Sequence, residues 1–220
     1  MSEILEIPIS SRQKRRKVEI CHVDGRFFAS KSDSAYLESD ARVSINRSAP
    51  STTGSAPFSK NNWQFNSNLC PILAELVAVL VEFGFADVFR LQMTSSESAV
   101  ATTSSESGFS KIPMKMEEIP FPDDREFRIK RLVVRDFWRK GYFLADGTRF
   151  GGDYLVYTKS PNQCHAEFVL LCTPCSDEKR ISAMRCCNQV KKTLILATTP
   201  SGDNLKPHYT KCEWFRPELF

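Results

Sequence analysis

Apolar and polar positions along the 220-residue chain predict a structured N-terminal part, a polar connection and a second, denser structured part. Near the start, Val18–Val23 alternates apolar and polar side chains and leads into Asp24-Gly25, a pair typical of a tight β-hairpin turn. Residues 71–83 are almost continuously apolar, begin with a proline and are followed by a glycine, which predicts a helix. A strand over 86–91 would complete a small α+β domain over residues 18–92.

Polar segments surround and interrupt this first unit. Residues 93–119 are rich in Ser and Thr and lack an apolar period, so we expect a flexible linker. Residues 48–62 have a similar composition and predict a loop within the first unit. Residues 1–17 end in the basic run Arg12–Lys17, which predicts a solvated, disordered tail. Such a run is also typical of a nuclear address or of a nonspecific RNA contact.

The apolar pattern becomes dense from residue 120 and predicts a second domain over 120–220. A helix is expected over 126–140, because apolar residues share one side of it and a glycine follows. Asp146-Gly147 predicts a two-residue hairpin turn between strands at 142–145 and 148–150. The other expected elements are strands at 153–157 and 165–172, a helix at 176–188, and strands at 191–199 and 207–214.

This order of elements should bring three polar side chains to one edge of a sheet. A short connection joins the strand that ends at Tyr157 to the strand that begins at His165, so antiparallel pairing places these two residues side by side. The helix and strand that follow form a β-α-β unit with parallel strands, which places His165 beside Lys191 or Lys192. Tyrosine, histidine and lysine together form a candidate acid–base set.

The chemistry of this set suits RNA cleavage by the 2′-hydroxyl. That reaction needs a base for the 2′-hydroxyl, an acid for the leaving 5′-oxygen and a positive charge beside the phosphate. Histidine suits proton transfer near neutral pH and lysine supplies a fixed cation, whereas tyrosine is a poor base unless its environment lowers its pKa. No carboxylate cluster in the sequence indicates a required metal. Dependence on the 2′-hydroxyl would discriminate against DNA.

Charge and cysteine content narrow the class of protein. The net charge of +4 is mildly basic and compatible with nucleic-acid binding. No apolar run approaches the roughly 20 residues of a membrane span, and the N-terminus lacks the apolar core of a signal peptide. We therefore expect an intracellular protein whose eight cysteines are mostly free thiols. A zinc site of Cys172, Cys175, Cys186 and Cys187 is disfavoured, because the adjacent pair does not repeat the CxxC spacing.

Several segments around the three polar residues carry a family resemblance. They run from Trp138 to Tyr142, from Asp146 to Tyr157, from Pro161 to Phe168 and from Val190 to Leu196. In order, spacing and chemistry, roughly residues 130–215 resemble the catalytic domain of the tRNA-splicing endonuclease family.

The resemblance implies a restriction-endonuclease-like α/β catalytic domain with a mixed sheet and no cofactor. It implies metal-independent cleavage of precursor tRNA at intron boundaries, leaving 2′,3′-cyclic phosphate and 5′-hydroxyl ends. In the family's register Tyr157 is the general base, His165 the general acid and Lys192 the transition-state stabiliser. Lys191 falls out of register, and Tyr154, three residues before Tyr157, is expected to face the other side of the strand.

The resemblance also implies a nuclear heterotetramer of two catalytic and two structural subunits. The Phe150–Tyr154 motif and the short N-terminal domain resemble the catalytic subunit that cuts the 3′ splice site. One alternative is the other catalytic subunit, which cuts the 5′ splice site. Another is a noncatalytic structural subunit, which the presence of all three catalytic side chains argues against.

A stand-alone RNA-binding module could use Arg12–Lys17 with Trp138 or Trp214, but the sequence lacks an RNA-recognition signature. Asp203 lies in a predicted loop and is a candidate for docking a partner subunit.

Overall fold

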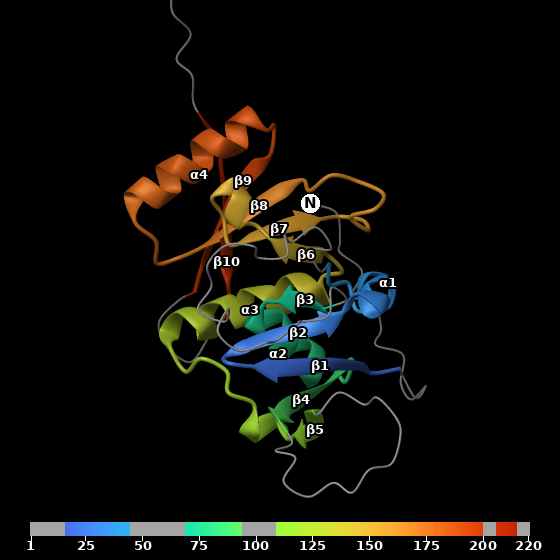
Figure 1. Ribbon diagram of the computed structural model, residues 1–220. Helices are drawn as coiled ribbons and strands as arrows, with labels where there is room; N and C mark the ends of the chain where they lie inside the picture. Colours follow the sequence, from blue (N-terminus) through green and yellow to red (C-terminus); the bar gives the residue numbers. More distant parts are fainter. Residues whose placement is uncertain (1–15, 45–68, 94–108, 200–205, 215–220) are drawn as a thin grey trace, which may run out of the picture.

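The computed structural model describes residues 16–44, 69–93, 109–199 and 206–214. Two five-stranded sheets lie one above the other, with two helices between them and a third on the outer face of the upper sheet (Figure 1). Helix α2 (Ala74–Glu82) packs against the lower, N-terminal sheet, and α3 (Arg125–Arg139) packs against the upper, C-terminal sheet. The two helices also pack against each other, and α4 (Asp177–Gln189) covers the far face of the C-terminal sheet.

The N-terminal sheet consists of β1 (Val18–Val23), β2 (Arg26–Ser30), β3 (Leu69–Ile72), β4 (Ala86–Met93) and β5 (Phe109–Met114). Its order is β3-β2-β1-β4-β5, with β1 and β4 parallel and the other neighbours antiparallel. The hairpin predicted at Asp24-Gly25 is confirmed. Both turn residues have positive φ, 46° and 76°, which is the conformation that an Asp-Gly pair favours.

Strand β5 corrects part of the predicted linker. The sequence predicts a flexible linker over 93–119, but residues 109–114 pair with β4, from Met93↔Phe109 to Val88↔Met114. A 3-10 helix follows at Met116–Glu118. Pro113 does not disrupt this pairing, because β5 is an edge strand and an edge strand tolerates a missing N–H. The Ser- and Thr-rich residues 94–108 lie outside the described residues, as does the loop predicted at 48–62.

Two further predictions concern the first helix and the basic tail. The helix predicted over 71–83 is confirmed, but it begins only at Ala74, because the residues before it pair with β2 as strand β3. Of the predicted tail, residues 1–15 lie outside the described part of the chain, as does Asp203. Arg16 forms an ion pair with Asp33, and Tyr36 of α1 (Ser34–Ser39) donates to the Arg16 carbonyl at 2.5 Å.

The two predicted domains share one hydrophobic core. Leu80 of α2 and Val134 of α3 are fully buried in the same cluster as residues of both sheets. Trp138 at the end of α3 is only 6% exposed and stacks on Phe83, with ring centroids 4.5 Å apart. The N- and C-terminal units therefore pack as one body. The burial of Trp138 removes it from the candidate RNA contacts.

The C-terminal sheet consists of β6 (Phe143–Asp146), β7 (Tyr154–Tyr157), β8 (Phe168–Cys172), β9 (Thr193–Thr198) and β10 (His208–Cys212). Its order is β10-β9-β8-β7-β6. The pair β8–β9 is parallel and is connected through α4, as the predicted β-α-β unit requires, and the other pairs are antiparallel. The predicted mixed α/β fold class is confirmed, with the α+β N-terminal unit ahead of it. Within the described residues, no helix is long and apolar enough to cross a bilayer.

The turn at Asp146-Gly147 differs from the predicted hairpin. Strand β6 pairs with β7 rather than with 148–150, which forms a 3-10 helix, η4 (Thr148–Phe150). Gly147 has a φ of −103°, outside the left-handed region that a type I′ turn requires. The Asp146 side chain accepts hydrogen bonds from the backbone N–H and the hydroxyl of Thr148, both at 3.0 Å, and so turns the chain into η4 instead.

Candidate active site

Strands β7, β8 and β9 place Tyr157 and Lys192 at the same edge of the C-terminal sheet. The β7–β8 register pairs Val156 with Phe168, and the β8–β9 register pairs Phe168 with Thr193. Extended by one residue, both registers place Tyr157 and Lys192 on either side of Glu167. Neighbouring strands lie about 4.8 Å apart, so the two backbones are separated by roughly 10 Å. The edge predicted from local topology is therefore present.

Lys192 extends along this edge toward the residue that follows His165. Its Nζ donates a 2.7 Å hydrogen bond to the carbonyl oxygen of Ala166, and it lies 5.6 Å from the centre of the Phe150 ring. An ammonium group has three donors, so two remain for a phosphate. Lys191 is exposed and has a left-handed φ of 53°, and it is Lys192 whose side chain reaches the edge.

His165 is exposed and lies just outside strand β8. The predicted strand began at His165, but the ladder with β7 begins at Phe168. Glu167 makes one backbone hydrogen bond with each neighbouring strand. Its N–H donates to the Val156 carbonyl at 3.0 Å, and its carbonyl accepts from the Thr193 N–H at 3.2 Å. The strand therefore begins after Glu167. His165 follows the turn that leaves β7, so its ring is free to meet a bulky substrate from solvent.

Tyr157 and Tyr154 face opposite sides of β7, as predicted. Tyr154 is 1% exposed and belongs to the core between the sheets, where burial and then the charge of Glu75 hold its pKa well above the usual range. Tyr157 is half-buried and packs against the cluster beneath α4. Burial, followed by the charges of Cys164 and Glu38, raises the pKa of Tyr157. The phenol of Tyr157 therefore keeps its proton at neutral pH.

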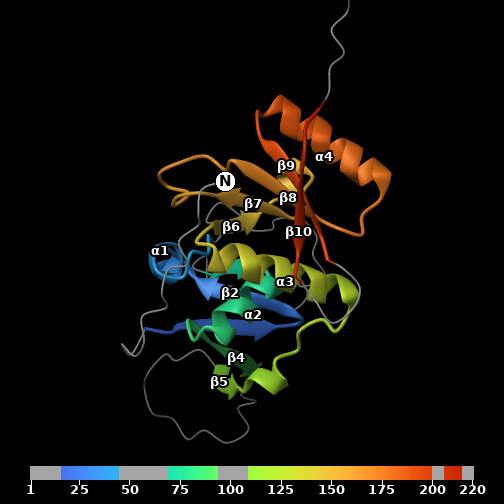
Figure 2. The same cartoon turned by 180° about the vertical axis from the view of Figure 1, so that it is seen from behind.

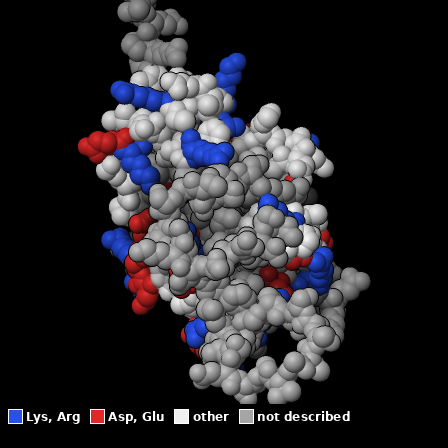
Figure 3. Space-filling view, viewed as in Figure 1, with Lys and Arg blue, Asp and Glu red and all other residues white. Residues whose placement is uncertain are grey.

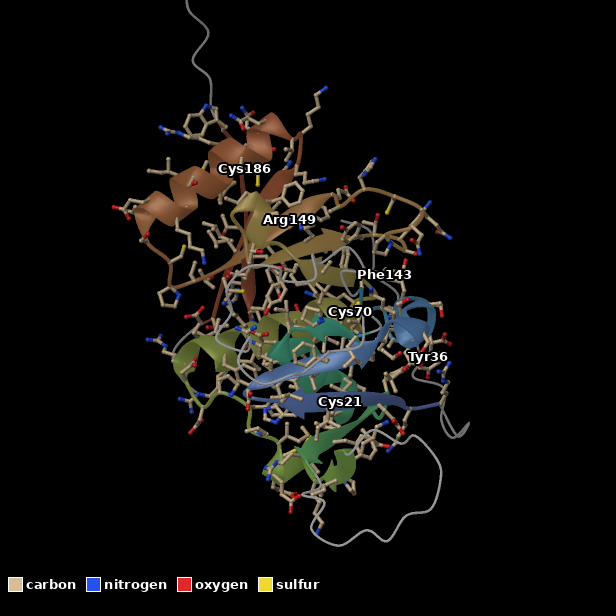
Figure 4. All side chains as sticks on the ribbon, viewed as in Figure 1. Cys21, Tyr36, Cys70, Phe143, Arg149 and Cys186 are labelled. Carbon is tan, nitrogen blue, oxygen red and sulfur yellow. The ribbon has the colours of Figure 1, made fainter. Side chains whose placement is uncertain are left out.

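A cavity of about 680 Å³ opens beside Tyr157, between the two units of the chain. Tyr157, Phe150 and Arg149 line it from the C-terminal side, whereas Arg26 and Glu38 line it from the N-terminal side. Figure 4 labels Arg149 in the upper, C-terminal unit and Tyr36 on α1 of the lower, N-terminal unit. On the face in Figure 3, several Lys and Arg side chains lie over the upper part, with a group of Asp and Glu side chains beside them, and charges of both signs also lie lower down. Lys192 at this edge, with Arg149 and Arg26 in the cavity lining, supplies positive charge for a polyanion.

The motif from Phe150 to Tyr154 builds the start of β7. A Cβ on Gly152 would lie 2.3 Å from Val169 and 3.0 Å from the Leu170 carbonyl oxygen, so this position requires glycine for close packing on β8. Asp153 accepts a 2.7 Å hydrogen bond from the Cys172 N–H and forms 3.3 Å ion pairs with Lys130 and Lys179. These contacts fasten β7 to β8, α3 and α4, and so fix the strand that delivers Tyr157.

The cysteines are all free thiols. Cys172 is buried at the end of β8, and burial raises its pKa well above the usual range. Burial, and then the charge of Cys186, raises the pKa of Cys187 to about 11. Across the described ranges, no three or more His, Cys, Asp or Glu side chains form a group that could hold a metal ion.

Sequence analysis missed one residue of the site, Glu38 of α1. This buried carboxylate accepts hydrogen bonds from Ser160 and Asn162, in the turn between Tyr157 and His165. The residues joined are 122 and 124 positions apart, so no local pattern could reveal the contact.

A mixed sheet whose edge carries tyrosine, histidine and lysine next to a cavity lined in part by Arg26 and Arg149 defines a candidate nucleolytic α/β domain. Residues 127–207, which include all three side chains, match the family described as tRNA intron endonuclease, catalytic C-terminal domain. Over these residues the chain is therefore similar to the catalytic domain of the tRNA-splicing endonucleases, which are RNA-cleaving enzymes.

Individual relatives agree with the family. The chain is 37% identical over 86 residues to the mouse tRNA-splicing endonuclease subunit Sen34, covering 37% of this chain and 27% of that protein. It is 29% identical over 111 residues to the tRNA-splicing endonuclease of Methanopyrus kandleri, covering 47% and 62%. It is 37% identical over 82 residues to the probable subunit sen2 of Schizosaccharomyces pombe, covering 33% and 22%. The chain thus spans about a quarter of the length of the mouse relative.

Proposed function

We propose that this chain is a catalytic subunit of a tRNA-splicing endonuclease and cuts precursor tRNA at the 3′ splice site. One observation carries the proposal. The Nζ of Lys192 donates a hydrogen bond to the carbonyl of Ala166, the residue after His165. Lys192 and Tyr157 lie on either side of Glu167 in the sheet. A cation, a candidate acid and a candidate base therefore come from the same edge of a domain that is similar to the endonuclease catalytic domain.

In the proposed reaction Tyr157 takes the proton from the 2′-hydroxyl at the splice site, and the 2′-oxygen attacks the adjacent phosphorus. The bond from phosphorus to the 5′-oxygen breaks, and His165 gives its proton to that oxygen. Lys192 offsets the extra negative charge that the phosphorane-like transition state carries. The products are a 2′,3′-cyclic phosphate and a 5′-hydroxyl. These steps need only the three side chains, so the proposed reaction is metal-independent.

The raised pKa of Tyr157 limits how much of this side chain is ready to act as a base. At neutral pH the phenolate is a minor species, because burial and the nearby charges of Cys164 and Glu38 disfavour it. A general base works best when its pKa lies near the operating pH, so the proposed role requires the bound complex to lower the pKa of Tyr157.

The finer parts of the proposal rest on the resemblance. The Phe150–Tyr154 motif and the short N-terminal unit resemble the subunit for the 3′ splice site, which motivates the choice of cut. The proposed partners are precursor tRNA, a second catalytic subunit and two structural subunits in a heterotetramer. The proposed compartment is the nucleus, which the basic run Arg12–Lys17 suits.

The two tyrosines of β7 provide the first test. In a reconstituted complex, Tyr157→Phe should slow the 3′ cut by about 100-fold, as expected for loss of a general base, and leave the 5′ cut unchanged. Tyr154→Phe should preserve both cuts and lower the free energy of unfolding by about 1 kcal/mol, because it removes a buried hydrogen bond to Glu75. Single-turnover cleavage of an end-labelled precursor tRNA resolves the two cuts.

Other outcomes of this experiment have defined meanings. Loss of the 5′ cut instead would replace the 3′ assignment by the other catalytic subunit. Loss of neither cut would overturn the catalytic proposal in favour of a structural subunit. If Tyr154→Phe is the change that slows cleavage, the assignment of the base to Tyr157 is wrong.

Metal removal provides an independent test of the mechanism. We expect the rate of cleavage to be the same, within a factor of about two, after dialysis against a chelator, since proton transfer and charge stabilisation come from side chains. The control keeps the tRNA folded with a polyamine, so that loss of tRNA structure is not mistaken for loss of catalysis. A large fall in rate that Mg²⁺ restores under these conditions would contradict the metal-independent step.

A further inference from the structure

Glu38 of the N-terminal unit lies against the turn that connects the two candidate acid–base residues. Its side chain is 6% exposed, although it is a carboxylate. Its Oε1 accepts hydrogen bonds from the Ser160 hydroxyl, from Asn162 Nδ2 at 2.6 Å and from the Asn162 backbone N–H at 3.3 Å. Hydrogen bonds to an ionised acceptor are stronger than those between neutral groups, and a buried carboxylate requires them.

The turn held by Glu38 ends directly at His165. The carbonyl of Ser160 accepts the N–H of Gln163 at 2.8 Å and the N–H of Cys164 at 3.3 Å, which closes residues 160–164 into a compact unit. Within the described part of the chain, the His165 ring itself makes no hydrogen bond. The position of that ring is therefore set by the backbone on both sides of it. Glu38 holds the turn before His165, and Lys192 binds the carbonyl of Ala166 after it.

Helix α1 is in turn fastened to the C-terminal unit. The segment after α1 forms a parallel bridge between Val43 and Leu144 of β6, and Ser44 N–H donates to the Leu144 carbonyl at 3.1 Å. Trp138 of α3 donates through Nε1 to the Ala41 carbonyl at 2.6 Å. In both views α1 lies on the same side of the molecule as the turn after β7 (Figures 1 and 2). Glu38 is thus presented from a fixed support.

We propose that Glu38 is a positioning residue for the endonuclease reaction: it fixes the 160–164 turn and thereby the distance between Tyr157 and His165. The proposal rests on the proposed function of the site and adds a role for the N-terminal unit in it. Proton transfer to a leaving group depends steeply on geometry, and a displacement of about 1 Å can lower a rate roughly 100-fold. Loss of Glu38 should therefore act on the rate of the chemical step more than on RNA binding.

Amide hydrogen exchange of the full chain tests the structural half without any activity. In Glu38→Ala we expect the Asn162, Gln163 and Cys164 amides to exchange at least 10-fold faster, with the β8 amides unchanged. Glu38→Gln keeps an acceptor oxygen and should retain most of the protection. Asp40→Ala, which removes an exposed carboxylate two residues away, is the matched control. Unchanged exchange in Glu38→Ala would overturn the proposal.

Single-turnover cleavage by the reconstituted complex tests the functional half. We expect Glu38→Ala to lower the rate at saturating precursor tRNA by about 10- to 100-fold, with little change in the concentration needed for half-saturation. Glu38→Gln should restore most of the rate. Asn162→Ala removes the side-chain amide that donates to Glu38. The double variant should be little slower than either single variant, because both changes act through one contact.

The failures can be told apart. If the wild-type complex does not cleave, the proposed function is wrong. If it cleaves and Glu38→Ala loosens the turn without slowing the rate, or if Glu38→Gln is as slow as Glu38→Ala, positioning by Glu38 is wrong while the endonuclease assignment stands. Should Glu38→Ala not fold, as judged by its thermal transition, Asn162→Ala carries both measurements.

Discussion

Replacing His165 by alanine is expected to lower the rate of one splice-site cut by roughly 10³-fold, within the range for loss of a positioned general acid. The leaving 5′-oxygen would have to depart as an alkoxide, which is a poor leaving group. The change should leave the fold intact, because His165 is exposed and lies outside strand β8. His208→Ala is the matched control, since this second exposed histidine lies on the edge strand β10.

The role of His165 as an acid, rather than as an RNA contact, can be isolated with a modified substrate. A precursor tRNA with sulfur in place of the bridging 5′-oxygen has a leaving group that needs no proton. On that substrate His165→Ala should cleave within about 10-fold of the wild-type rate, whereas Tyr157→Phe should remain slow, because the 2′-hydroxyl still requires a base. If the sulfur substrate gives no rescue, His165 acts on binding or orientation and the acid role is wrong.

The placement of Tyr157 and Lys192 on either side of Glu167 could be predicted because it follows from local connections. A short link between two strands enforces antiparallel pairing, and a helix between two strands enforces parallel pairing. From these rules alone, Tyr157, His165 and one of Lys191 and Lys192 are expected on one edge. The two-residue side-chain period of a strand likewise separated Tyr154 from Tyr157. The choice of Lys192 over Lys191 came from family resemblance, and the 2.7 Å contact of Lys192 with Ala166 agrees with it.

The features that could not be predicted depend on contacts distant in sequence. Strand β5 forms because β4 offers an unpaired edge, and its own residues give only a weak strand signal next to a polar stretch. In the sequence Glu38 resembles a solvated acid on a helix. Its burial depends on contacts of residues 41–44 with α3 and β6, which fix the position of α1. Trp138 was a candidate RNA contact but is buried, because Phe83 of the N-terminal unit stacks on its ring.

Gly147 is required at its position, but for a reason other than the turn that the sequence predicts. The Asp146-Gly147 pair predicts a type I′ turn, in which glycine is needed for its positive φ. The observed φ of −103° is accessible to any residue. What excludes a side chain is the backbone of Tyr154, since a Cβ on Gly147 would lie 2.6–2.8 Å from its C, N and Cα atoms.

We therefore expect Gly147→Ala to lower the free energy of unfolding by about 3 kcal/mol, at the upper end for overpacking, because backbone atoms cannot rotate away as a side chain can. That is a large share of the roughly 5–15 kcal/mol that stabilises a typical domain. Relief of the overlap would separate β6 from β7, the strand that carries Tyr157, so the splice-site cut should fall as well.

Urea unfolding monitored by circular dichroism measures this cost, and Gly84→Ala is its natural comparison. Gly84 has a left-handed φ of 74°, and nothing lies within 4 Å of an added Cβ, so only backbone strain of about 1 kcal/mol is expected there. The difference between the two variants isolates steric overlap from conformational preference. If Gly147→Ala costs no more than Gly84→Ala, then β6 and β7 can separate freely at this point. The start of β7 would then not be fixed tightly enough to hold Tyr157 at the edge.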